Sequence, residues 1–347
     1  MRNTLTSSLR RRAKSHPALQ RPRLWLAFGL AAACLGLGLG LGSTPATAQS
    51  FPTKPVRIVV PFGPGGVGDL TARAVAGALS QQWGHNVVID NRPGAGGVVA
   101  AESVANAEAD GHTLFLMSNG TAVSAAVFQK LPFDTVKDFT PITTLGYFDI
   151  AVVVPESSPF KTLQELVAHA KAQPGRVNMG SINVGSTQNL AAELFKSTAG
   201  MDVQVVPYNG TPALMAAMRG GQLDVAVEIL GPVLPHLQSK AMRVLAVTGE
   251  KRSVVLPEVP TALESGIQGF VASSWNALAT PAGTPQAVVD KIQRDVGTAL
   301  ASPEVKKRLQ DLNVEARGST PQETAALLAA DIQRWTDVVR KANIPRQ

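Results

Sequence analysis

The chain has 347 residues, with 32 Lys and Arg, 25 Asp and Glu, and one cysteine. The seven basic residues that make up the net charge of +7 all precede residue 24, so the rest of the chain is balanced. The high pI therefore gives no reason to expect a nucleic-acid partner. Cys34 lies in the same N-terminal region, which excludes a disulfide, a thiol nucleophile or a Cys-ligated metal from the remainder.

The N-terminus has the three-part layout of an export signal. Residues 1–23 carry basic residues and no acid, residues 24–42 are apolar, and Ala46-Thr47-Ala48 follows. We predict cleavage after Ala48 and a periplasmic protein. A retained membrane anchor is the alternative, but five glycines in the apolar stretch and the small-residue site argue against it. The Arg10-Arg11-Arg12 run leaves Sec and twin-arginine export both open.

Short Val- and Ile-rich runs then alternate with helical patterns almost to the end of the chain, which predicts an α/β fold built on a parallel sheet. Strands are expected at 56–60, 87–90, 113–117, 150–154, 177–181, 203–206, 225–229, 244–247 and 274–279. Helices are expected near 70–83, 97–107, 122–130, 162–172, 187–198, 211–219, 232–239, 285–300, 303–311 and 321–342.

The turn at residues 61–69, between the first strand and the first helix, is rich in glycine. A helix start has free N–H groups and a partial positive charge, so this turn is suited to an anion held by neutral donors. Gly63, Gly65 and Gly68 also fit the G-x-G-x-x-G pattern of dinucleotide sites, with Asp90 about 20 residues on. Pro61 and Pro64 weaken that alternative, because proline lacks an N–H donor.

Three further loops, 118–121, 180–187 and 207–211, also follow predicted strands and open helices. All four loops lack Lys, Arg and His, and they contain hydroxyl, amide and glycine residues. Because ligands of open α/β sheets gather at the carboxyl ends of strands, the loops predict one site for a small polar ligand. Asp69 is expected to cap a helix or to meet a ligand amine or hydroxyl, since it would repel an anion. Glu228 ends an apolar strand and faces either the cleft or solvent.

The sequence lacks the residue patterns of metal sites and of serine hydrolases. His85, His112, His169 and His236 occur singly, without metal-ligand spacing, so no metal is expected. No G-x-S-x-G elbow is present, and Gly185-Ser186-Thr187 has no histidine nearby in the sequence. These patterns therefore indicate neither a metal site nor a serine hydrolase.

Several motifs together resemble the extracytoplasmic receptors of tripartite tricarboxylate transporters, called Bug receptors, over residues 51–344. They are FPTKPVRIVVPF at 51–62, PGG at 64–66 with Asp69, DNRPGAGG at 90–97, KDFTPI at 137–142, PY at 207–208 with Gly210, LAVT at 245–248, LPEVPT at 256–261 and PAGTP at 281–285. The resemblance implies a two-domain fold like that of periplasmic binding proteins, with crossing hinge strands and a ligand cleft between the domains. Asn189 stands where the family often has His, which leaves the ligand open, and Asn313 replaces a usual Gly.

The resemblance implies a receptor and not an enzyme, with no catalytic residue and no cofactor. Such a receptor captures a small carboxylate or related acid or amide and delivers it to membrane permease subunits. We expect a monomer. The expected parts are the signal at 1–48, one domain from 49–150 and 273–347, and a second from 151–272, with hinges near 147–155 and 270–280. Two alternatives remain open: a nicotinamide-cofactor oxidoreductase, and an orphan receptor that signals to a sensor protein. The expected ligand-binding residues are Phe62, Gly65, Gly66, Asp69, Ser118, Asn119, Thr121, Ser181, Gly185, Ser186, Thr187, Asn209 and Glu228.

Overall fold

The computed structural model describes residues 51–341 and 343–347, and the predicted export signal lies outside these residues. Within them, ten strands form one mixed sheet, with the order β2-β1-β3-β9-β4-β7-β5-β6 and with β8 and β10 also paired to β4. The strands are β1 (Val56–Val60), β2 (Val87–Asn91), β3 (Thr113–Ser118), β4 (Phe139–Pro155), β5 (Asn178–Ile182), β6 (Gln204–Tyr208), β7 (Val225–Ile229), β8 (Met242–Val247), β9 (Ser273–Pro281) and β10 (Val314–Ala316).

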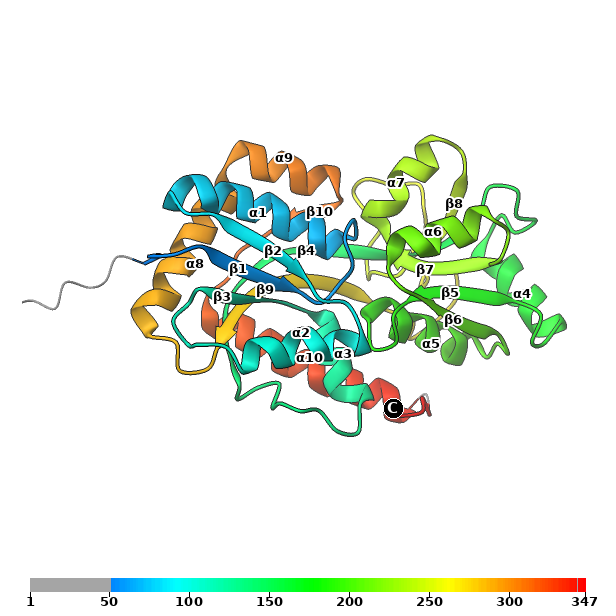
Figure 1. Cartoon of the computed structure of the whole chain (residues 1–347). Helices are drawn as coiled ribbons and strands as arrows, with labels where there is room; N and C mark the ends of the chain where they lie inside the picture. Colours follow the sequence, from blue (N-terminus) through cyan, green and yellow to red (C-terminus); the bar gives the residue numbers. More distant parts are fainter. Residues whose placement is uncertain (1–50, 342) are drawn as a thin grey trace, which may run out of the picture. The chain divides into compact units, whose positions relative to one another are not determined.

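The helices lie on both faces of this sheet (Figure 1). They are α1 (Val67–Trp83), α2 (Val98–Ala105), α3 (Asn119–Val127), α4 (Leu163–Ala172), α5 (Thr187–Ala199), α6 (Thr211–Arg219), α7 (Leu230–Gln238), α8 (Gln286–Ala301), α9 (Pro303–Asp311) and α10 (Pro321–Lys341), with a 3-10 turn η1 (Ala95–Gly97) before α2. None of the helices in the described ranges is both long and apolar enough to cross a membrane.

Two groups of strands share the long strand β4. In the first group, β1 pairs in parallel with β2 and β3, while α1, α8 and α9 pack together and α10 packs on α3 and β4. In the second group, β5 pairs in parallel with β6 and β7, and α5 and α6 both contact β5 and β7. Figure 1 shows the first group with α1, α8, α9, α2, α3 and α10, and the second with α4 to α7.

The expectation of a parallel sheet is correct for these outer strands and wrong for the centre. β9 runs antiparallel to β3 and β4, and β4 runs antiparallel to β7, β8 and β10. The strands β4 and β9 connect the two groups directly, without the crossover helix that parallel neighbours need. The strand alternation along the chain does not record this pairing, because it shows the order of elements and not their direction.

Among the strands, β4 and β10 differ most from the expectation. β4 begins at Phe139, well before the predicted strand at 150–154, and its pairing with β9 shifts register between Pro141 and Thr143 and between Thr144 and Gly146. Such bulges let a segment that contains Pro, Thr and Gly join the sheet, although it lacks the apolar run from which a strand would be predicted. β10 has only three residues and was not predicted. Asn313, just before it, has a left-handed φ of 53°, a conformation that Gly adopts readily and that Asn tolerates better than most other residues.

Candidate functional site

A cavity lies where the carboxyl ends of strands from both groups meet the starts of five helices. The helices are α1, α3, α5, α6 and α7, and β4 and β9 supply the remaining wall. The cavity is lined by Phe62, Gly63, Gly66, Val67, Gly68, Ser118, Phe148, Ile182, Asn183, Thr187, Gln188, Gly210, Thr211, Ile229, Ser274 and Asn276. Four of the predicted ligand-binding residues therefore share one cavity, namely Phe62, Gly66, Ser118 and Thr187.

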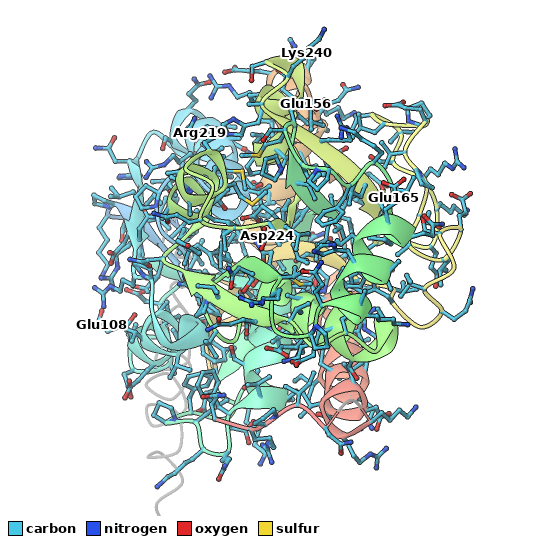
Figure 2. All side chains as sticks on the ribbon, turned by 90° about the vertical axis from the view of Figure 1, so that its right-hand side faces the viewer. Glu108, Glu156, Glu165, Arg219, Asp224 and Lys240 are labelled. Carbon is cyan, nitrogen blue, oxygen red and sulfur yellow. The ribbon has the colours of Figure 1, made fainter. Side chains whose placement is uncertain are left out.

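No charged side chain of the described residues lines this cavity. A helix start has free N–H groups and a partial positive charge, so lining one space with residues from five helix starts favours an anion there without a cation. The charged side chains of Glu108, Arg219 and Lys240, by contrast, are exposed and lie toward the outside of the molecule (Figure 2). The arrangement is suited to an anion, which would be held by backbone and side-chain dipoles.

Three buried polar atoms on the cavity wall have no hydrogen-bond partner among the described residues. They are Ser118 Oγ, Asn183 Oδ1 and Asn276 Nδ2. A buried polar atom left unpaired costs about 1–3 kcal/mol. Their convergence on one cavity indicates that a polar ligand is expected to complete these bonds.

The space inside is small. The cavity has a volume of only about 30 Å³. That volume corresponds to roughly two water molecules. Phe62 also lines a second, smaller cavity together with Ser118 and the predicted residue Thr121. Thr121 Oγ1 accepts a hydrogen bond of 3.1 Å from the Ser118 backbone N–H, which fixes the start of α3.

The carboxylate of Asp69 organises the first loop from behind the cavity wall. Its Oδ2 accepts from the backbone N–H of Gly65 at 3.0 Å, and Arg73 Nε and Asn91 Nδ2 also donate to the carboxylate. Burial by itself would raise the pKa of Asp69, but the hydrogen bonds from Arg73, Gly65 and Asn91 outweigh it and lower the pKa. Neither Asp69 nor Gly65 lines the cavity, so both shape the loop that presents Gly66.

The loop before α5 contacts both α3 and η1. Ser124 Oγ lies 2.6 Å from Gly96 O and 3.1 Å from Gly185 O. Gly96 and Gly185 approach so closely that a Cβ built on Gly185 would lie 2.8 Å from the Gly96 Cα. Because Ser124 belongs to the first strand group and Gly185 to the second, these contacts hold the two groups against each other.

The side chain of Asn119 completes a buried network. Its Oδ1 accepts from Thr187 Oγ1 and from Trp335 Nε1, both at 3.0 Å, and its Nδ2 donates to Asp331 Oδ2. Trp275 Nε1 donates to the same Asp331 oxygen at 2.7 Å. Asn119 is fully buried and does not line the cavity, so its side chain joins α3, α5 and α10.

The remaining predicted residues lie next to the cavity and do not line it. Ser186 Oγ caps α5 by accepting from Asn189 N at 3.1 Å, and Ser181 Oγ lies 3.0 Å from Asn189 Nδ2. Asn209 is outside the lining, although the next residue, Gly210, is part of it. Glu228 is fully buried behind the wall and bonds to Gln188, which does line the cavity.

The sequence reasoning did not select Gln188 or Asn276. Asn276 is an amide inside the otherwise apolar run Trp275-Asn276-Ala277-Leu278, and it is only 1% exposed. A polar residue in a buried strand is the same signal that singled out Glu228, so it was available for Asn276 as well. Gln188 gave no such signal, because a glutamine in the first turn of a helix is ordinary.

The fold has the architecture of a periplasmic binding protein, in which two strand groups share the long strands β4 and β9 and surround a cavity. The family model of the tripartite tricarboxylate transporter family receptor matches residues 71–344. The chain therefore belongs to the tripartite tricarboxylate transporter receptor family. The protein BugT of Bordetella pertussis is 33% identical over 321 residues, which cover 92% of this chain and 97% of BugT.

Solved structures agree with this assignment. Rpa4515 of R. palustris, solved with adipate, has a TM-score of 0.82 and 33% identity, covering 85% of this chain and 99% of the other. MatC (Rpa3494) of Rhodopseudomonas palustris, solved with bound malate, has a TM-score of 0.79 and 33% identity, covering 83% and 100%. The periplasmic binding protein BugD has a TM-score of 0.82 and 28% identity, covering 86% and 100%.

Proposed function

We propose that this protein is an exported receptor that captures a small carboxylate in the cavity and delivers it to a tripartite-type permease. The observation that carries the proposal is the convergence of five helix starts on a cavity that no charged side chain of the described residues lines. Two relatives with TM-scores of 0.79 or more were solved with dicarboxylates, adipate and malate, which supports an acid as the ligand.

The contacts across the cavity imply that the ligand enters when the two strand groups separate. The cavity volume of about 30 Å³ is too small for a dicarboxylate to enter without some opening. β4 and β9 are the connections that would bend, near the predicted hinges at 147–155 and 270–280. A ligand favours the closed arrangement only by the additional bonds that it makes there. Ser118, Asn183 and Asn276 each offer an unpaired atom for such a bond.

Replacing Asn276 by leucine tests this function. The unpaired Asn276 Nδ2 stabilises nothing in the free protein, so Asn276→Leu is expected to leave the melting temperature unchanged or higher. The same change removes a donor to the ligand carboxylate, and we expect adipate or malate to bind at least about tenfold more weakly by calorimetry.

Thr71→Val is the matched control. Thr71 Oγ1 is also buried and has no hydrogen-bond partner within the described part of the chain, but it does not line the cavity. Like Asn276→Leu, the change should leave the melting temperature unchanged or higher, but it should not alter affinity. If a panel of mono-, di- and tricarboxylates produces no binding to the wild-type protein, the proposed function is wrong.

Delivery to a permease and signalling to a sensor are distinguished by uptake. If the receptor serves transport, deletion of its gene is expected to abolish uptake of the acid that the purified protein binds. Unchanged uptake, with loss of a transcriptional response to the same acid, would instead favour the signalling alternative. Membership of the receptor family gives no support to the nicotinamide-cofactor alternative.

A further inference from the structure

Glu228 is a buried carboxyl directly behind the cavity wall. It lies near the end of β7, is 0% exposed, and pairs across the sheet with Ala151 of β4. Its Oε1 accepts from the Ile229 backbone N–H at 2.7 Å and from Gln188 Nε2 at 2.8 Å. No Lys or Arg side chain of the described residues bonds to it. Burial raises the pKa of Glu228 against the opposing effect of hydrogen bonds from Gln188, Ile229 and the Thr211 side chain.

These bonds fix which way the Gln188 amide is turned. A backbone N–H only donates, so Glu228 Oε1 acts as an acceptor whether or not the carboxyl is protonated on Oε2. With Oε1 unprotonated, Gln188 presents its Nε2 to that oxygen, as it does in the structure, because the reversed amide would place two bare oxygens against each other. No donor among the described residues bonds to Gln188 Oε1, and Gln188 lines the cavity.

The cavity thus offers a ligand two kinds of polar partner. Helix starts and Asn276 Nδ2 supply donors suited to a carboxylate, whereas Gln188 Oε1 and the unpaired Asn183 Oδ1 supply acceptors. A carboxylate oxygen cannot donate to these acceptors and is repelled by them. A site with a buried acceptor discriminates against a ligand that leaves that acceptor unpaired.

We propose that Glu228 positions Gln188 so that the receptor selects a small acid carrying a hydrogen-bond donor, such as a hydroxyl or amino group, over the unsubstituted acid of the same length. This inference rests on the proposed function, since it names the class of acid that the same cavity accepts. Glu228 acts through Gln188 and does not touch the ligand itself, because it does not line the cavity.

Matched ligand pairs test the proposal by isothermal titration calorimetry of the purified protein. The pairs are succinate and malate, glutarate and 2-hydroxyglutarate, and adipate and 2-aminoadipate. The wild-type protein is expected to prefer the donor-bearing member of at least one pair by about tenfold or more. In Gln188→Met, which keeps the length of the side chain without the acceptor, that ratio is expected to fall to about one to two.

Two substitutions of Glu228 separate positioning from packing. Glu228→Gln keeps an acceptor oxygen for Ile229 and Gln188, so the preference should persist. Glu228→Met removes that oxygen at similar volume and frees the Gln188 amide to turn, so the preference should fall as in Gln188→Met. Glu193→Gln is the control, because Glu193 is a half-buried carboxyl on α5 away from the cavity and its pKa is also raised by burial. Melting curves confirm that each variant is folded.

The outcomes distinguish this inference from the proposed function. If acids bind and both members of every pair bind equally, the inference is wrong and the proposed function stands. A preference that survives in both Gln188→Met and Glu228→Met also overturns it. If no acid of either kind binds, the proposed function fails and the inference fails with it.

Discussion

Replacing Gly185 with alanine tests whether the cavity works by closing. Gly185 has a φ of +82°, and a Cβ on it would lie 2.8 Å from the Gly96 Cα and 2.9 Å from Phe128 Cε2. Ordinary contact begins at 3.4 Å, so the closed arrangement would have to widen by about 0.6 Å at this point. The contact between Ser124 Oγ and Gly185 O, which is 3.1 Å long, would lengthen at the same time.

The magnitude follows from two separate costs. Alanine at a left-handed φ costs about 1–2 kcal/mol, but that cost is present in the open and closed arrangements alike and lowers only the stability. The overlap with Gly96 exists only when the groups are closed, and overpacking of this kind costs about 1–3 kcal/mol. We therefore expect Gly185→Ala to weaken binding of the preferred acid by about 5- to 150-fold.

Calorimetry measures the affinity, and small-angle scattering measures whether the acid still compacts the protein. Gly266→Ala is the matched control, because Gly266 has a φ of +86° and no atom of the described residues lies within 4 Å of the position that an alanine methyl group would take there. It should show the same loss of stability without a loss of affinity. If Gly185→Ala binds the acid and compacts as the wild type does, and Gly266→Ala does the same, the proposed closure of the two strand groups is wrong.

Two further predictions concern pH and the first loop. The pKa of Glu228 is raised in the fold, so its contribution is fully present below the unfolded pKa of about 4.3 and is lost as pH rises through the folded pKa. The melting temperature of the wild type relative to Glu228→Gln should thus fall as pH rises above about 4.3, and a rise would contradict the assignment. The pKa of Asp69 is lowered, so its contribution is present above about pH 3.9 and is lost as pH falls through the folded pKa. Asp69→Asn should cost about 1.5–3 kcal/mol of unfolding free energy at pH 7 and less in acid, as measured by urea titration, and an equal cost at both pH values would contradict it.

Much of the fold could be predicted because its signals are local. The apolar runs at Val56–Val60 and Val225–Ile229 and the small-residue helices between the strands are written in consecutive residues. The loops that open α1, α3, α5 and α6 were identified for the same reason, since glycine, hydroxyl and amide residues mark a helix start wherever it lies.

The assignment of individual side chains within those loops was less complete. Asn119 and Thr187 both carry the polar groups expected of ligand contacts, yet they bond to each other at 3.0 Å, and Thr187 alone lines the cavity. Gln188 and Asn276 line it without having been selected. Sequence spacing does not show that the Thr187 hydroxyl donates to Asn119, a residue 68 positions away.

The sequence by itself determined the kinds of element, their order, the absence of cations from the loops and the resemblance to a receptor family. All of these depend on residue types and on short-range backbone preferences. Only the tertiary structure decided the antiparallel course of β4 and β9 and the convergence of five helix starts on one cavity. It also decided which polar side chains line the cavity and which bond to other residues behind it. These depend on which distant segments pack together, because burial and hydrogen-bond partners are properties of the assembled sheet and not of any one stretch of chain.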